Sequence, residues 1–114
     1  MPALEPHELN LDASKILFWK FSELDVAVAP QTQAAKLTTD LAQVGLAPGV
    51  LLDIGWYPAL RDDGEFVVLV VREGEWETPI ARFTATSWDE LRGAVAKAVV
   101  LAKVSELDRR KGSP

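Results

Sequence analysis

The sequence contains no cysteine, and histidine and methionine occur once each. Without cysteine the chain has no thiol nucleophile, no disulfide bond and no cysteine metal site. Nucleophilic catalysis needs a base beside the nucleophile, and the single imidazole, His7, lies in a proline-containing N-terminal segment where an exposed tail position is the simpler interpretation. We therefore expect no catalytic residues, no metal site and no cofactor.

Other familiar signals are missing as well. The seven glycines form neither a phosphate-binding loop nor a dinucleotide-binding fingerprint, which excludes nucleotide binding by those routes. The longest apolar run, residues 98–102, is far shorter than the ~18 residues that a membrane span needs. Residues 1–14 carry three acids and no basic start, so they do not resemble a secretory signal. These absences favour a cytoplasmic protein with no membrane partner.

The size and composition are those of one globular domain. For 114 residues, the usual scaling gives about 6,200 Å² of folded surface against about 18,100 Å² unfolded, which is enough burial for a single core. With 48% apolar and 25% charged residues, the chain is neither disordered nor fibrous. We expect residues 1–14 to form an irregular lead-in, residues 15–108 a single α+β domain, and residues 109–114 a basic, frayed tail.

The formal net charge of −5 is distributed unevenly along the chain. Residues 1–30 carry five acids and two bases, and residues 50–86 carry seven acids and three bases, whereas residues 87–114 carry four acids and six bases. Because phosphate contacts supply much of the affinity for nucleic acids, a mostly acidic surface argues against a nucleic-acid partner. It would attract a basic protein.

The N-terminal third gives two strand signals and one helix signal. Residues 15–21 are dense in aromatic and β-branched residues and predict a strand, although a short helix starting at Asp12 or Ser14 remains open. Residues 26–29 are a candidate second short strand. Over residues 31–44 the apolar residues recur at helical spacing, which predicts a helix ending at Gly45. Its apolar stripe consists of Ala34, Leu37, Leu41 and Val44.

Three strands follow in the centre of the chain. Residues 50–56 alternate apolar and other residues, as in a half-buried strand. Residues 65–72 are apolar on both sides, which is typical of a central strand. Residues 76–84 form the third strand, which Pro79 restricts to an edge or a bulge.

The last segment has the pattern of a capped helix. Ser87 followed by Glu90 is a capping box. Apolar residues continue from it along one stripe, which comprises Trp88, Leu91, Val95, Ala98 and Ala102. The complete pattern predicts an α+β two-layer sandwich, in which an antiparallel sheet with a central three-strand meander carries two helices on one face.

A second apolar set on the last helix falls outside this stripe. It consists of Val100, Leu101 and Val104. One helix on one sheet does not need both sets, so the second is either the seat of the N-terminal segment or the face of a homodimer.

Aromatic residues among acids mark a candidate binding surface. Trp56 and Tyr57 are adjacent in a strand and point to opposite faces, so one of them should face away from the core. Three glutamates around Gly74 surround Trp76 and either protect a sheet edge or pair with basic residues of a partner. The expected partner-binding residues are Trp56, Tyr57, Asp62, Asp63, Glu65, Glu73, Glu75, Trp76 and Glu77.

Three short motifs, DIGWYP at residues 53–58, DGEF at residues 63–66 and EWETP at residues 75–79, precede the capped helix. Over residues 50–105 this region resembles small bacterial immunity proteins, which neutralise a cognate toxin of contact-dependent or other polymorphic toxin systems. The resemblance implies a non-enzymatic protein that is acidic when its toxin is a basic nuclease.

The residues and the resemblance together predict a non-enzymatic protein-binding module, foremost an immunity protein that occludes a basic toxin. The alternative is a structural or adaptor protein that self-associates through the second apolar set of the last helix. A metal-dependent enzyme ranks last, and its ligands would be Asp53, Asp62, Asp63 and Glu65.

Overall fold

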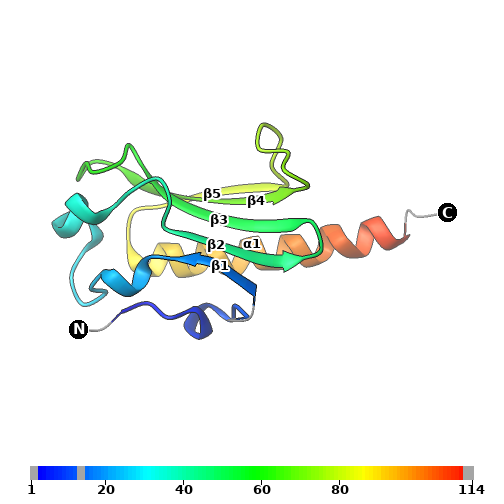
Figure 1. The fold of residues 1–114 in the computed structure, drawn as a ribbon, viewed down its shortest axis with the longest axis horizontal. Helices are drawn as coiled ribbons and strands as arrows, with labels where there is room; N and C mark the ends of the chain where they lie inside the picture. Colours follow the sequence, from blue (N-terminus) through cyan, green and yellow to red (C-terminus); the bar gives the residue numbers. More distant parts are fainter. Residues whose placement is uncertain (1–2, 13–14, 112–114) are drawn as a thin grey trace.

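A computed structural model describes residues 3–12 and 15–111, the last six of them by their backbone alone. It shows an α+β fold in which five antiparallel strands, in chain order, form one meander sheet beside a long helix (Figure 1). The strands are β1 (Ile16–Trp19), β2 (Ala42–Ala47), β3 (Val50–Tyr57), β4 (Glu65–Arg72) and β5 (Ala81–Ala85), and the helix is α1 (Trp88–Lys111). Short 3₁₀ turns are η1 (Pro6–Leu9), η3 (Phe21–Glu23) and η4 (Pro30–Lys36).

The prediction of a helix over residues 31–44 is wrong, because α1 is the single α-helix in the described part of the chain. Residues 31–44 instead form η4, an extended crossing and the start of β2, and η4 is interrupted by a non-helical backbone at Gln33. The backbone N–H of Trp56 donates to the carbonyl of Thr38, so the crossing hydrogen-bonds to β3. This long-range pairing overrides the local helical spacing.

Two strand predictions also need correction. Residues 26–29 form a turn, in which the Asp25 carboxylate accepts a hydrogen bond from the Ala27 N–H at 2.9 Å. The strand expected over residues 76–84 is confined to β5, after a loop that contains Pro79. A proline cannot donate a ladder hydrogen bond, and β5 is an edge strand as expected.

The strands around residues 16–19, 50–57 and 65–72 are confirmed. The helix alternative at Ser14 lies outside the described residues.

One face of the sheet and one stripe of α1 make the core. Alternate residues of β3 and β4 are fully or almost fully buried there, and Trp56 contacts Phe66 edge-on at a ring separation of 4.9 Å. The predicted stripe of α1 is buried in the same cluster. The strand residues concerned are Val50, Leu52, Ile54, Trp56, Phe66, Val68 and Val70.

The N-terminal segment is part of this core and is not only an irregular lead-in. Leu4, Leu9 and Leu11 are buried, and η1 lies between them. The indole N–H of Trp19 donates to the carbonyl of Leu4 at 3.0 Å. The first residues therefore supply part of the core.

The start of α1 carries the predicted cap. Ser87 Oγ accepts the Glu90 N–H at 3.1 Å, and the Glu90 carboxylate accepts the Thr86 N–H at 2.8 Å. The Thr86 hydrogen bonds lower the pKa of Glu90. The carboxylate thus reaches one residue further back than a standard capping box. The C-terminal turns of α1 extend past the sheet (Figure 1), and residues 112–114 of the expected tail lie outside the described residues.

Candidate functional site

The sheet face opposite α1 has no α-helix over it in the described part of the chain; we call it the open face. Register places one residue from each of four strands side by side across it, because directly paired residues of antiparallel strands share a face. This row runs Gln43, Asp53, Leu69 and Arg82. The open face is therefore built from the same strands as the core, but from the alternate residues.

Asp53 lies at the centre of the open face and is only 6% exposed. Its carboxylate accepts a hydrogen bond from Gln43 Nε2 at 3.0 Å. Burial raises the pKa of Asp53; the Gln43 hydrogen bond opposes this shift and nearby Asp40 adds to it. In the described part of the chain, no lysine or arginine forms an ion pair with Asp53. Asp53 is thus a desolvated carboxylate that no described residue provides with a countercharge.

Tyr57 is an exposed aromatic residue of this face, with 42% of its surface accessible, and Phe18 of β1, which pairs with Gln43, is equally exposed. Its hydroxyl donates to the carbonyl of Thr39 at 3.4 Å, across Gly55. Burial raises the pKa of Tyr57, and the negative charges of Asp53 and Asp40 raise it further. Asp40 and Asp53 thus act on Tyr57 through their charges, and Glu65 is its cross-strand partner. We call Asp40, Asp53, Tyr57 and Glu65 the tyrosine site.

Gly55 makes the tyrosine site possible. A Cβ on Gly55 would lie 2.1 Å from the Thr39 carbonyl oxygen and 2.9 Å from a ring carbon of Tyr57. Both separations are far below van der Waals contact, so the crossing chain and the ring close over the strand only where a side chain is absent.

Trp56, expected as a partner contact, is not on the surface. It is fully buried on the helix-covered face, and its indole N–H donates to the carbonyl of Arg61 at 2.7 Å. Gly64 packs against the indole, where a Cβ would lie 2.4 Å from Nε1. Trp56 therefore positions the β3–β4 turn from below and cannot touch a partner directly.

The β3–β4 turn carries two of the expected acids. Asp62 and Asp63 are exposed, and Arg61 holds Asp63 through two hydrogen bonds of 2.9 and 2.8 Å. Arg61 lowers the pKa of Asp63, and Asp63 raises that of Arg61. One of the two charges is therefore matched within the turn itself.

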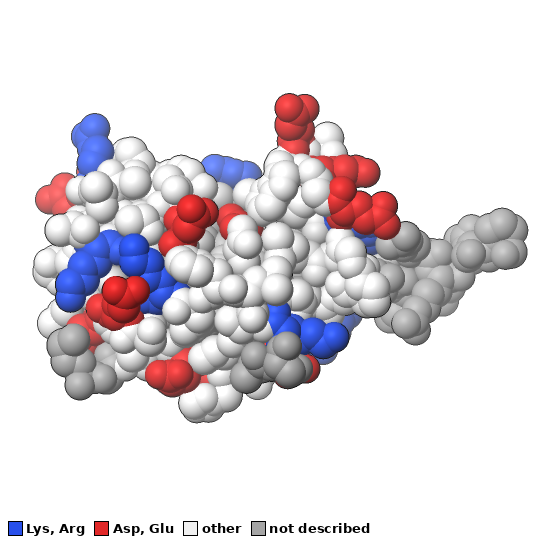
Figure 2. Space-filling model, viewed as in Figure 1, with Lys and Arg blue, Asp and Glu red and all other residues white. Residues whose placement is uncertain are grey.

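The remaining expected residues lie at the opposite end of β4. Figure 2 shows acidic side chains gathered over the β4–β5 loop, at the upper right of the molecule. The eight residues of β4 separate this loop from the β3–β4 turn by roughly 24 Å. The single patch expected from sequence is therefore two groups. The second group, the acidic loop, consists of the exposed residues Glu73, Glu75, Trp76 and Glu77.

Sequence reasoning missed Asp40 and Gln43, because both were assigned to the helix that does not form. Asp53 was considered only as a metal ligand. Its alternation with Leu52 and Ile54 was the signal that placed it on the face opposite the core. Among residues 3–12 and 15–105, no group of three His, Cys, Asp or Glu side chains is arranged to hold a metal ion. No helix in the described residues could span a membrane.

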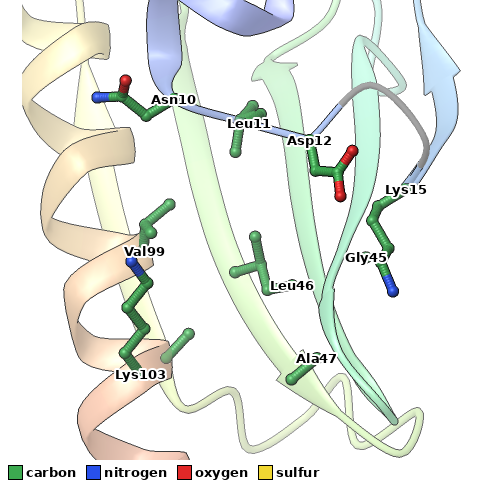
Figure 3. Close-up of a pocket in the computed structure, with 10 residues that line it drawn as sticks. Asn10, Leu11, Asp12, Lys15, Gly45, Leu46, Ala47, Val99 and Lys103 are labelled. Carbon is green, nitrogen blue, oxygen red and sulfur yellow. The ribbon is translucent and has the colours of Figure 1, made fainter.

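A pocket of about 470 Å³ lies apart from the tyrosine site, between the N-terminal segment, the end of β2 and α1 (Figure 3). Leu11, Leu46 and Val99 make its apolar wall, and Lys15 and Lys103 add positive charge. Residues 13–14, which follow the N-terminal wall of the pocket, lie outside the described residues.

Comparison with protein families, with curated proteins and with solved structures found no match for this chain.

Proposed function

We propose that this chain is a non-enzymatic binding module whose open face receives a basic protein, as an immunity protein receives its toxin. The resemblance of residues 50–105 to immunity proteins supports the class of function. The acidic balance of the chain supports a partner of positive charge.

The proposal rests mainly on the buried carboxylate of Asp53, which no described lysine or arginine pairs with. A buried carboxylate without a cation destabilises the folded state, and Gln43 offsets only part of that loss. A lysine or arginine of a partner at the tyrosine site would supply the missing countercharge. The chain alone has no structural use for the charge, because an asparagine would accept the same hydrogen bond.

Tyr57 provides the anchor beside this charge. Tyrosine combines a large apolar ring with a polar end and is enriched among the residues that dominate interface energies. The ring is already held over Gly55 by the Thr39 contact, so little conformational freedom is lost on binding.

The acidic loop adds long-range attraction. Its three glutamates are exposed at the far end of β4, where they raise the rate of encounter with a basic partner without needing to contact it. We therefore assign affinity to the tyrosine site and association rate to the acidic loop.

The test is retention of a basic protein on an immobilised column of the chain. Wild-type protein and the Asp53→Asn/Tyr57→Ala double variant are compared with an Asp62→Asn control, using lysate of the native cell at low and high salt. We expect a protein of high isoelectric point on the wild-type and control columns and little on the double variant. Where the neighbouring gene encodes a toxin, co-expression of the chain should restore growth. Equal retention on all three columns would disprove the assignment of the tyrosine site.

A further inference from the structure

A second surface, separate from the open face, is formed by β5 and α1. The strand order leaves one side of β5 without a partner in the described part of the chain. Ala81–Ala85 contains no proline and only one charged residue, Arg82. Natural sheets usually protect such an edge with charges, prolines or bulges. Here Pro79 and Glu77 precede the strand, so neither of them protects the edge from within it.

The apolar side of α1 continues this edge. Val100, Leu101 and Val104 are 58%, 41% and 46% exposed. The first two line a shallow apolar hollow of about 460 Å³ together with Phe83 of β5 and Ala96 and Lys97 of α1. The free strand edge and the exposed helix side are therefore one surface.

We propose that this surface binds a second copy of the chain, so that β5 pairs with β5 of the partner and the two α1 helices pack antiparallel. A two-fold axis through Phe83 places Arg82 opposite Thr84 and Ala81 opposite Ala85. No charged residue then faces its own copy in the strand ladder. The two sheets become one sheet of ten strands.

The helix side is self-complementary about the same axis. The hollow at Phe83 is lined on α1 by Ala96, Lys97, Val100 and Leu101, so the helices cross near this level. An antiparallel crossing there brings the large Leu101 and Val104 of one copy towards the small Ala96 and Gly93 of the other. A Cβ added at Gly93 meets nothing within 4 Å, so this position offers space. Large residues at one end of the strip thus meet small residues at the other.

The dimensions of the two elements agree. β5 is roughly 17 Å long, and α1 from Gly93 to Val104 spans roughly the same length. Two stacked elements of this length give an interface at the small end of stable dimers. Both open faces stay accessible, so the dimer does not depend on the proposed partner binding.

The experiment is sedimentation velocity of the full chain from 1 to 300 µM, with Val104→Lys as the test variant and Val28→Lys as its control. Val28 is also 46% exposed, but its carbonyl accepts a hydrogen bond from Trp88 at the start of α1, roughly 24 Å along the helix from Val104. We expect wild type and Val28→Lys to dimerise and Val104→Lys to weaken the dimer at least tenfold. A wild type that stays monomeric, or a dimer that Val104→Lys leaves intact, overturns the proposal.

Amide hydrogen exchange at 1 and 300 µM then tests the strand pairing. Dimerisation should slow exchange within Ala81–Ala85 and leave Ile16–Trp19, at the opposite sheet edge, unchanged. A dimer that slows exchange only at β1 would show that the other edge associates. Loss of partner binding without loss of the dimer would disprove the proposed function alone.

Discussion

The two faces of the sheet are made from alternate residues of the same strands, yet they differ in what they contribute. On the helix-covered face, Leu52, Ile54 and Trp56 are fully buried among apolar side chains. On the open face, Asp53 is buried without a cation and Tyr57 is exposed beside it. The first arrangement stabilises the fold, and the second reduces stability while creating an acidic, aromatic surface.

Under the proposed function, this difference separates structural residues from binding residues within one strand. Substitutions at neighbouring positions of β3 should therefore affect different quantities: stability at a position on the helix-covered face, and partner binding at a position on the open face. Such a separation is typical of sites where function is retained at the expense of stability.

The largest effect on stability is expected from alanine substitutions at two neighbouring residues of β3 that point to opposite faces. Trp56→Ala removes a fully buried ring and its hydrogen bond to Arg61, and should lower the free energy of unfolding by about 3–5 kcal/mol. Tyr57→Ala removes a half-exposed ring and should lower it by about 1 kcal/mol. Urea unfolding followed by tryptophan fluorescence measures both. Equal losses would show that the two faces are not distinct.

A second comparison uses two strand glycines. Gly55→Ala places a methyl group against the Thr39 carbonyl and should destabilise the protein by about 2 kcal/mol or more. Gly45→Ala is the control, because its Cβ would meet the Lys15 carbonyl at 3.6 Å, an ordinary contact. Thermal unfolding of both variants should show a clear loss only at Gly55. A stable Gly55→Ala would mean that the crossing chain does not close over β3.

Substitution of Asp53 should have a smaller effect on stability and should increase it. Its pKa is raised in the folded state, so the folded protein holds a proton more tightly than the unfolded chain does. Asp53 therefore destabilises the protein at neutral pH, and this loss disappears as the pH falls through the folded pKa towards the unfolded value of about 3.9.

Asp53→Asn should then raise the free energy of unfolding at pH 7, and the difference should vanish below the unfolded pKa. Unfolding midpoints of wild type and variant at pH 3 to 8 provide the measurement. Gln43→Ala should destabilise wild type more than it destabilises the variant, because it removes a hydrogen bond to a charged group. A variant less stable than wild type at pH 7 contradicts this interpretation.

The smallest effect is expected in the β3–β4 turn. Asp63→Asn removes an ion pair between two exposed side chains, which contributes little because water and salt screen it. Its unfolding midpoint should stay within experimental error of wild type at 0.15 M salt. A clear loss would indicate that the turn depends on this pair rather than on Trp56.

The sequence predicted the second half of the fold well. Residues 50–56 alternate and residues 65–72 are apolar on both sides, and both patterns indicate strands. In residues 87–102 the cap and the apolar stripe both indicate a helix. It failed over residues 31–44, where Leu37, Leu41 and Val44 are buried as expected but lie on extended chain and β2 instead of a helix. Their spacing fits a helix, and only the pairing of this segment with β3 excludes it.

The placement of the candidate site residues could be predicted in part. Sequence required one of Trp56 and Tyr57 to face outward, and the shared phase of Trp56 with Leu52 and Ile54 already indicated which one. The separation of the two acidic groups could not be seen, because it depends on the length and direction of β4. Asp40 could not be found while its segment was assigned to a helix.

The role of Asp53 is tested most directly by two measurements on the Asp53→Asn variant. Calorimetry gives its affinity for the basic protein that the wild-type column retains, and urea unfolding gives its stability. We expect the two quantities to change in opposite directions: the variant should be more stable than wild type and should bind at least tenfold more weakly. A variant that is more stable and binds as tightly as wild type would show that Asp53 does not serve partner recognition.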